Sequence, residues 1–145
     1  RAARLELARC FGLGPVWDVG AAPLADQVAA SEKFDCVIEC TGRLDGWQEA
    51  FDRTAPGGQV LLFGGVPRGT TFPVDTYRLH YEEIRLLGSF HFSPRDVAKA
   101  REYLLAGTLE LDPLISGRVP MAQLPEALRC LQRGEGIQYA VDPWA

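Results

Sequence analysis

Near-continuous apolar runs alternate with amphipathic segments along the chain. The apolar runs occupy residues 36–40, 60–63 and 84–90. Runs of this length, with little polar alternation, are typical of parallel strands that are covered on both faces. Stretches with apolar residues at helical spacing lie between them. This order of elements predicts an α/β protein built on a doubly wound parallel sheet.

The remaining pattern predicts five helices and two further short strands. The helices are expected at 1–11, 23–32, 45–53, 95–106 and 124–133. Asp45 is expected to cap the third helix, Ser93 and Pro94 begin the fourth, and Gly134 ends the fifth. Short strands are expected at 15–19 and 139–141, a turn at 56–58, a loop over 67–80, and extended or irregular chain over 111–120.

Small residues follow three of the predicted strands. The pairs are Thr41-Gly42, Gly64-Gly65 and Gly88-Ser89. Ligands of an open parallel sheet bind outside the carboxyl ends of its strands, and glycine there lets a flat ligand approach the backbone. Arg43 follows the first pair, where its guanidinium plane could stack on a base, or it could be a solvated turn residue.

Composition narrows the class of protein. The chain has 145 residues, with 15 Lys and Arg against 19 Asp and Glu, and a net charge of −4. An acidic balance argues against nucleic acid or an anionic membrane as the main partner. No apolar run approaches the ~20 residues of a membrane span. The four cysteines are too few for a disulfide scaffold and favour a reducing, cytoplasmic location.

Cysteine and histidine patterns give little support for a metal site. Cys36 and Cys40 share a predicted strand, but no second pair lies at ligand spacing. We therefore expect all four cysteines, including Cys10 and Cys130 on helical stripes, to be core residues. The two histidines, at positions 80 and 91, are expected to be hydrogen-bonding surface or loop residues.

The segment Asp35-Cys-Val-Ile-Glu-Cys-Thr-Gly42-Arg-Leu-Asp45 resembles the second half of the nucleotide-binding domain of medium-chain, zinc-type alcohol and polyol dehydrogenases. The resemblance continues through the opening helix and through 55–65, 84–90, 111–116, 126–128 and 133–137. It implies a partial Rossmann-like doubly wound parallel sheet. Residues 1–91 would be the second half of a dinucleotide-binding domain, and 92–145 the returning segment of the parent catalytic domain.

The resemblance implies hydride transfer between a small alcohol or polyol and NAD or NADP. It places eight residues at the dinucleotide. They are Thr41, Gly42 and Arg43 by the adenine and its ribose, Gly64, Gly65 and Val66 by the nicotinamide, and Ser89 and Phe90 with backbone groups by the carboxamide. Because members of this family dimerise through the last strand of the domain, and an apolar edge strand invites pairing, a homodimer through 84–90 is expected.

The same resemblance implies a missing front half. The chain begins with Arg1, and its opening helix has no cap residue. We expect a carboxyl-terminal fragment that is inactive alone, with no catalytic residue and with zinc only in the missing segment. Without its parent neighbours, strand 15–19 would pack beside 36–40, pair with another chain or fray. The strand at 139–141 would have no assured sheet partner.

Two alternatives remain open at this point. A methyltransferase-like α/β domain also has a helix followed by Pro-Gly-Gly and an apolar strand, but its sheet closes with an antiparallel strand. A vestigial chain that survives only as a dimerisation module would have no affinity for dinucleotides.

Overall fold

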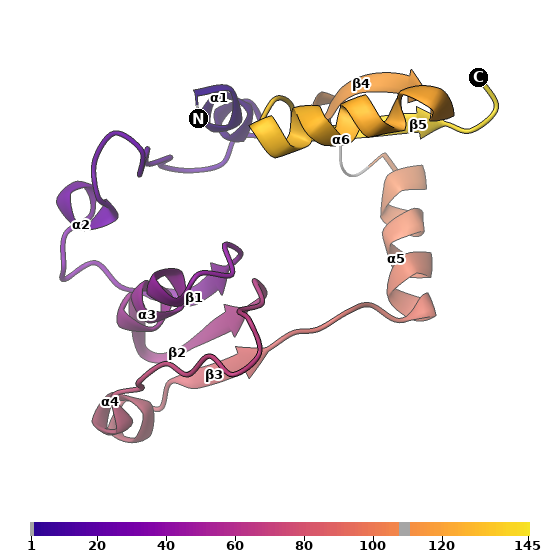
Figure 1. Cartoon of the computed structure of the whole chain (residues 1–145). Coiled ribbons are helices and arrows are strands. Elements are labelled where there is room, and N and C mark those ends of the chain that lie inside the picture. Colours follow the sequence, from indigo (N-terminus) through magenta and orange to yellow (C-terminus); the bar gives the residue numbers. More distant parts are fainter. Residues whose placement is uncertain (1, 108–110) are drawn as a thin grey trace. The chain divides into compact units, whose positions relative to one another are not determined.

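The computed structural model describes residues 2–107 and 111–145 (Figure 1). The chain divides into two compact units. Residues 21–92 form one, here called the sheet unit. The residues up to Gly20 together with 93–145 form the other, here called the terminal unit. The predicted domains, 1–91 and 92–145, concern descent from a parent protein and stay a prediction.

A three-stranded parallel sheet is the centre of the sheet unit. It consists of β1 (Phe34–Glu39), β2 (Thr54–Leu62) and β3 (Arg85–Gly88), in that order. Both neighbouring pairs run parallel, which confirms the predicted α/β class and the parallel direction of a partial Rossmann-like sheet. The parallel direction of β3 contradicts the methyltransferase-like alternative.

One face of this sheet carries the core. α3 (Leu44–Asp52) packs on it and buries Phe51 completely against Val60 and its neighbours. Trp47, from the same helix, meets the ring of Phe72 edge-on at 5.4 Å between centroids. Figure 1 shows α3 lying along β1 and β2. This packing explains the apolar spacing of the segment, since one stripe of α3 faces the sheet.

The opposite face of the sheet is exposed. Ile38, Leu61 and Leu87 are aligned by the strand register and form one row across the three strands. Side chains alternate between faces along a strand, so this row points away from Val60. Ile38 is 58% exposed and Leu87 43% exposed. We call these three residues the open face.

The helix predicted over 23–32 is much shorter. α2 covers only Leu24–Gln27, because Val28 turns to an extended backbone conformation and buries its side chain. The loop predicted over 67–80 likewise ends in a helix, α4 (Thr76–Tyr81). Asp75 caps α4 by accepting hydrogen bonds from the backbone N–H groups of Tyr77 and Arg78.

The predicted turn at 56–58 lies inside β2. Phe34 pairs with Thr54 and Cys36 with Gln59, so β2 holds extra residues between two pairs of the ladder. Gly57, with φ of +75°, lies in this irregular stretch. Positive φ is the conformation that glycine adopts at low cost, which explains the Pro-Gly-Gly sequence there.

The terminal unit holds a second, smaller parallel pair. β4 (Ile115–Pro120) pairs with β5 (Gln138–Asp142), and α6 (Leu124–Arg133) connects them and packs on both (Figure 1). Short 3₁₀ helices, Asp112–Leu114 and Met121–Gln123, flank β4. The concern that 139–141 would have no sheet partner is therefore wrong. Gly134, with φ of +77°, ends α6 as predicted.

Two further helices belong to the terminal unit, α1 (Ala2–Cys10) and α5 (Pro94–Leu105). The predicted start of α5 is confirmed by a capping box. The Ser93 hydroxyl oxygen accepts from the backbone N–H of Asp96, and the Asp96 carboxylate accepts from the backbone N–H of Ser93. Within the two described ranges, none of the helices combines the length and the apolar character that crossing a membrane requires.

Two further sequence predictions are wrong. Residues 15–19 form no strand, because a strand needs a hydrogen-bonded neighbour and the sheet described here offers them none. The four cysteines are not core residues: Cys10, Cys36 and Cys40 are exposed and Cys130 is half-buried. Cys36 lies in β1 on the same side as Ile38, so its apolar surroundings in the sequence did not imply burial.

Candidate functional site

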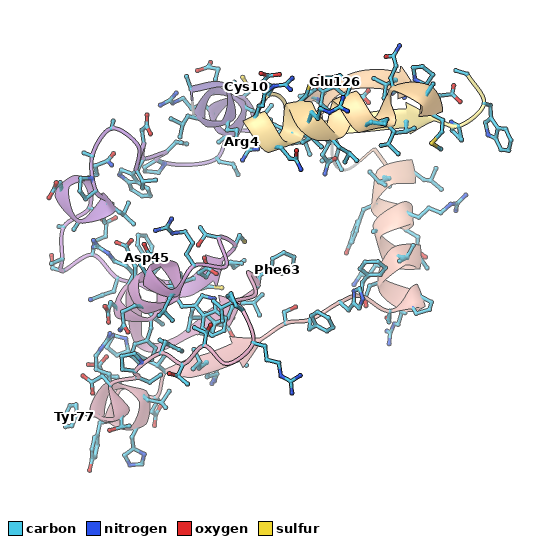
Figure 2. All side chains as sticks on the ribbon, in the orientation of Figure 1. Arg4, Cys10, Asp45, Phe63, Tyr77 and Glu126 are labelled. Carbon is cyan, nitrogen blue, oxygen red and sulfur yellow. The ribbon has the colours of Figure 1, made fainter. Side chains whose placement is uncertain are left out.

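The three strands of the sheet unit end level with one another. Glu39 in β1 pairs with Leu62 in β2, and Leu62 pairs with Gly88 in β3. The segments that follow, 41–43, 63–66 and 89–90, therefore leave the sheet at one edge, which we call the carboxyl edge. All eight residues assigned to the dinucleotide lie on these segments. Figure 2 labels Phe63 just beyond the end of β2 and Asp45 at the start of α3.

Glu39 organises the first of these segments. Its carboxylate accepts hydrogen bonds from the backbone N–H groups of Thr41, at 2.6 Å, and Gly42, at 3.3 Å, and from the Thr41 hydroxyl. Its carbonyl oxygen accepts from the N–H groups of Phe63 and Gly64, both at 2.9 Å. Sequence reasoning missed this role. The available signal was a carboxylate at the end of an apolar strand.

Gly42 and Gly64 are in direct contact with each other. A Cβ atom on Gly64 would collide with the backbone nitrogen of Gly42, and one on Gly42 would lie 2.5 Å from the carbonyl oxygen of Gly65. The indole N–H of Trp47, from α3, donates to the Gly64 carbonyl at 2.9 Å and holds the 63–64 turn in place. The sequence argument that these glycines admit a ligand is thus incomplete, because chain packing alone requires two of them.

Gly65 differs from its neighbour. A Cβ atom there would meet nothing within 4 Å, and the same holds for Gly88 at the end of β3. The space beside these two glycines is therefore available to a ligand. Val66, next along the chain, is half-buried, while the Phe63 side chain is exposed.

Arg43 forms a two-pronged pair with Asp45. Its Nε and Nη2 donate to the two carboxylate oxygens of Asp45 at 2.9 and 2.6 Å. These hydrogen bonds raise the pKa of Arg43 and hold the pKa of Asp45 below its ordinary value. The predicted cap is wrong: α3 begins at Leu44, and Asp45 binds Arg43 and the N–H of Gly46 instead. The fork holds the guanidinium plane in one orientation.

The third segment is short and open. The Ser89 N–H donates to the Leu62 carbonyl at 3.4 Å, which continues the ladder by one residue. Phe90, which follows, is 92% exposed. The carboxyl edge thus combines a hydrogen-bonded turn at 41–43 with an open, apolar side formed by Phe63, Gly65 and Phe90.

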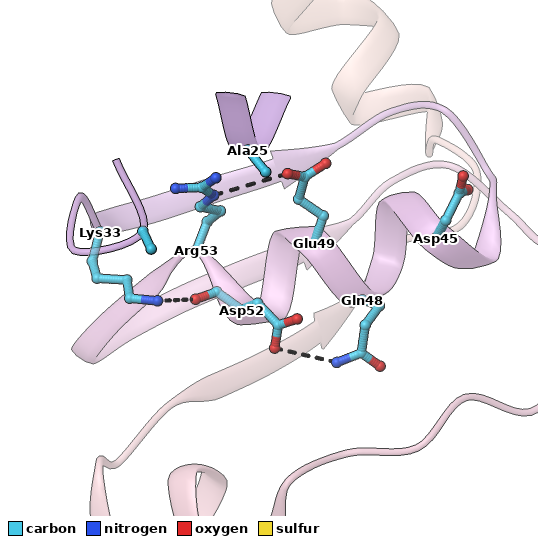
Figure 3. A pocket seen from close by; sticks show the side chains of 8 residues that line it. Ala25, Lys33, Asp45, Gln48, Glu49, Asp52 and Arg53 are labelled. Carbon is cyan, nitrogen blue, oxygen red and sulfur yellow. Dashed lines mark hydrogen bonds and ion pairs between the residues drawn. The ribbon is translucent and has the colours of Figure 1, made fainter. Parts of the chain in front are cut away.

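A separate hollow of about 430 Å³ lies beside α2 and α3 (Figure 3). It is lined by Ala25, Ala30, Lys33, Asp45, Gln48, Glu49, Asp52 and Arg53. Lys33 donates to the Asp52 carbonyl at 2.6 Å, and Arg53 lies 3.9 Å from Glu49. Arg53 also donates to the Ala29 carbonyl at 2.7 Å. The cationic side chains that line the hollow, Lys33 and Arg53, are therefore already bonded to neighbouring groups of the chain. The hollow is not the candidate site.

Metal ligands do not gather in the described part of the chain. Within 2–107 and 111–145, no three His, Cys, Asp or Glu side chains are placed to share an ion.

Comparison with known proteins identifies a family. The family model of zinc-binding dehydrogenases matches residues 1–106. An L-threonine 3-dehydrogenase of Streptomyces coelicolor is 30% identical over 142 residues, and that of Rhizobium etli (strain CIAT 652) is 25% identical. Each alignment takes in 96% of this chain but 41% of the relative. The chain thus spans less than half the length of these relatives.

Solved structures agree with the fold. A zinc-binding dehydrogenase from Sinorhizobium meliloti 1021, solved bound to NADP, is 26% identical with a TM-score of 0.80, over 88% of this chain and 39% of that one. A dehydrogenase from Escherichia coli CFT073, solved with NADH, has a TM-score of 0.82 at 17% identity, over 97% of this chain and 41% of that one. At that identity the second likeness shows the fold alone.

Proposed function

This chain belongs to the zinc-binding dehydrogenase family, and from that premise we propose that its carboxyl edge binds part of NAD or NADP. The whole protein would oxidise a small alcohol or polyol. When bound, the nicotinamide supplies the hydride acceptor. The observation that carries the proposal is the level ending of three parallel strands, with open space beside Gly65.

The turn at 41–43 suits the adenine end better than a phosphate. The N–H groups of Thr41 and Gly42 already donate to Glu39, and that of Arg43 donates to the Thr41 hydroxyl at 3.2 Å. No N–H of this turn is left for an anion. What the turn offers is the exposed, oriented guanidinium plane of Arg43, which can stack on a base.

The other side of the edge suits the nicotinamide. Gly65 has no obstructing neighbour, and Phe63 and Phe90 expose aromatic rings beside it along the edge. Val66, Ser89 and Phe90 would bound this side, with backbone groups of the last two directed to the carboxamide. A flat, largely apolar ring can occupy such a surface at low desolvation cost.

We propose that this chain binds and orients the cofactor and leaves the chemistry to other residues of a larger protein. The family zinc would be held outside these 145 residues, and the chain alone would not reduce NAD with alcohol. Alcohol-dependent NADH formation by the purified chain, or stoichiometric zinc after dialysis, would contradict this division of labour.

Titration with NADH tests the binding proposal. NADH is added to the 145-residue chain, and the fluorescence of NADH and that of Trp47 are followed. Gly65→Val fills the open space and is expected to weaken binding about 10-fold or more, equivalent to about 1.4 kcal/mol. Gly14→Val, at another glycine with nothing within 4 Å, is the matched control and is expected to bind as the wild type does.

Failure of this titration has a defined meaning. Absence of saturable NADH binding by the wild type would overturn the proposal and favour the alternative of a vestigial dimerisation module. Equal affinities of wild type and Gly65→Val would place the dinucleotide elsewhere.

We also propose a homodimer through β3 and a cytoplasmic location. β3 is an edge strand of its sheet, and an unpaired apolar edge favours pairing. All four cysteines are free thiols, as a reducing compartment would keep them. Sedimentation velocity tests the dimer, and fractionation of the source cells tests the location.

A further inference from the structure

The Glu39 carboxylate occupies a space that three glycines leave open. A Cβ on Gly46 would lie 2.9 Å from its Oε1, and one on Gly64 would lie 2.8 Å from its Oε2. Gly42 closes the third side and donates its N–H to Oε2. Glu39 is only 5% exposed, although it stands at the end of its strand. Gly42 and Gly64 lie in two segments of the carboxyl edge and Gly46 lies in the first turn of α3, so Glu39 is the group around which the 41–46 and 63–64 segments are assembled.

The buried Glu39 carboxyl group is surrounded by hydrogen-bond donors. None of the salt bridges in the described part of the chain involves Glu39. Its compensation comes from the N–H groups of Thr41 and Gly42, from the Thr41 hydroxyl, and from its place beside the first turn of α3. Since a buried carboxylate is costly without such donors, the donors are held in place around it.

A hydrogen-bond relay connects this carboxylate to Arg43. The Thr41 hydroxyl donates to Glu39 and accepts from the backbone N–H of Arg43 at 3.2 Å. The carbonyl oxygen of Glu39 meanwhile holds Phe63 and Gly64 through their N–H groups. One residue therefore fixes the 41–43 turn with its side chain and the 63–64 turn with its main chain.

We propose that Glu39 is a positioning residue that fixes the Thr41–Arg43 turn for the adenine end of the dinucleotide. The inference rests on the proposed function and assigns a residue that the resemblance did not. Its side chain acts on the adenine end through Arg43. Its main-chain bonds to the 63–64 turn do not depend on the side chain, so the nicotinamide end is insensitive to a change of that side chain.

Amide exchange in Glu39→Gln tests the fixing of the turn without any ligand. The amide keeps one acceptor oxygen but turns an NH₂ group toward groups that are themselves donors. Hydrogen exchange of the Thr41 and Gly42 amides, followed by NMR, is expected to become about 10- to 100-fold faster. Glu49→Gln is the matched control: it makes the same chemical change at a carboxyl group whose ion-pair partner among residues 2–107 and 111–145 is Arg53, at 3.9 Å. It is expected to leave both amides unchanged.

Fragments of the dinucleotide test the positioning itself. AMP represents the adenine end and nicotinamide mononucleotide the other end. Glu39→Gln is expected to weaken the binding of AMP about 10-fold and to leave the affinity for nicotinamide mononucleotide within about 2-fold of the wild-type value. A merely structural role would weaken both alike. Thermal unfolding of the three proteins separates local from global effects.

The outcomes divide cleanly. Unchanged exchange at Thr41 and Gly42 overturns the proposal, and so does unchanged AMP affinity where the wild type binds AMP. If the wild type binds neither fragment, the proposed function is wrong, and so is the role of Glu39 at the adenine end. The exchange measurement then decides by itself whether Glu39 fixes the turn. If Glu39→Gln does not fold, Thr41→Val removes only the relay hydroxyl. It is then expected to speed exchange at the Arg43 amide and to weaken AMP, and the absence of both effects overturns the proposal.

Discussion

At the scale of the residue, two adjacent glycines at the end of β2 have different roles. Gly64 is required by the chain itself, because a Cβ there would meet the backbone of Gly42. Gly65 has free space and is required, on the proposed function, by the ligand. Sequence alone could not separate them, since both are glycines after an apolar strand and the difference depends on a turn 22 residues earlier.

Alanine at each position separates the two roles. Gly64→Ala is expected to lower the free energy of unfolding by about 1–3 kcal/mol, because the added methyl forces two backbones apart. Gly65→Ala is the neighbouring control and is expected to unfold like the wild type. Urea titration followed by Trp fluorescence measures both. Equal midpoints for the two variants would show that the 42–64 contact is not required.

The Arg43–Asp45 pair gives a prediction about pH. The pKa of Asp45 is lowered from 3.8, chiefly by its hydrogen bonds from Arg43. A carboxyl with a depressed folded pKa stabilises the fold above its unfolded pKa and loses that contribution as pH falls through the folded one. Arg43→Ala is therefore expected to raise the pKa of Asp45 toward 3.8, measured by NMR titration of the carboxyl carbon. The pKa of Asp96, which Ser93 lowers, serves as the internal control and should not move.

At the scale of the element, Arg78 connects α4 to the end of α3. Its guanidinium donates to the carbonyls of Phe51, Asp52 and Thr54, and to the Glu82 carboxylate at 2.9 Å. These carbonyls lie where α3 ends and β2 begins, past the last full turn of helical hydrogen bonds. The Arg78 side chain thus holds the short, six-residue α4 in place.

Removal of that side chain should loosen the sheet unit. Arg78→Ala is expected to lower its free energy of unfolding by about 2 kcal/mol, since several hydrogen bonds to a charged donor are lost at a half-buried site. Arg68→Ala, an exposed arginine in the same unit, is the control and is expected to stay within about 0.5 kcal/mol of the wild type. A loss of equal size in both variants would contradict the role given to Arg78.

The elements that sequence predicted well are those with local signals. α5 has its Ser93–Asp96 box and α6 its Gly134 stop, and both begin and end close to the expected residues. The strand at 15–19 and most of the helix at 23–32 failed, because their formation depends on neighbours that a local pattern does not contain. For the site, family resemblance chose eight residues. The role of Glu39 became visible only once three glycines were seen around it.

At the scale of the whole molecule, the edges of the sheet carry the remaining prediction. The proposed dimer pairs two β3 strands about a two-fold axis. Leu87→Lys would bring like charges into one sheet and is expected to raise the dimer dissociation constant at least about 10-fold. Leu105→Lys, at an exposed site on α5, is the matched control. Sedimentation velocity over a range of concentrations measures both, and a wild type that stays monomeric throughout contradicts the dimer.

The open face also has a practical side. Ile38, Leu61 and Leu87 present water with a continuous aliphatic strip on a sheet whose architecture normally shields both sides. Salting-out ions strengthen the tendency of such a strip to leave water. Crystallisation from sulfate would therefore promote aggregation of the protein. A mild amphiphile below its critical micelle concentration would keep concentrated preparations in solution.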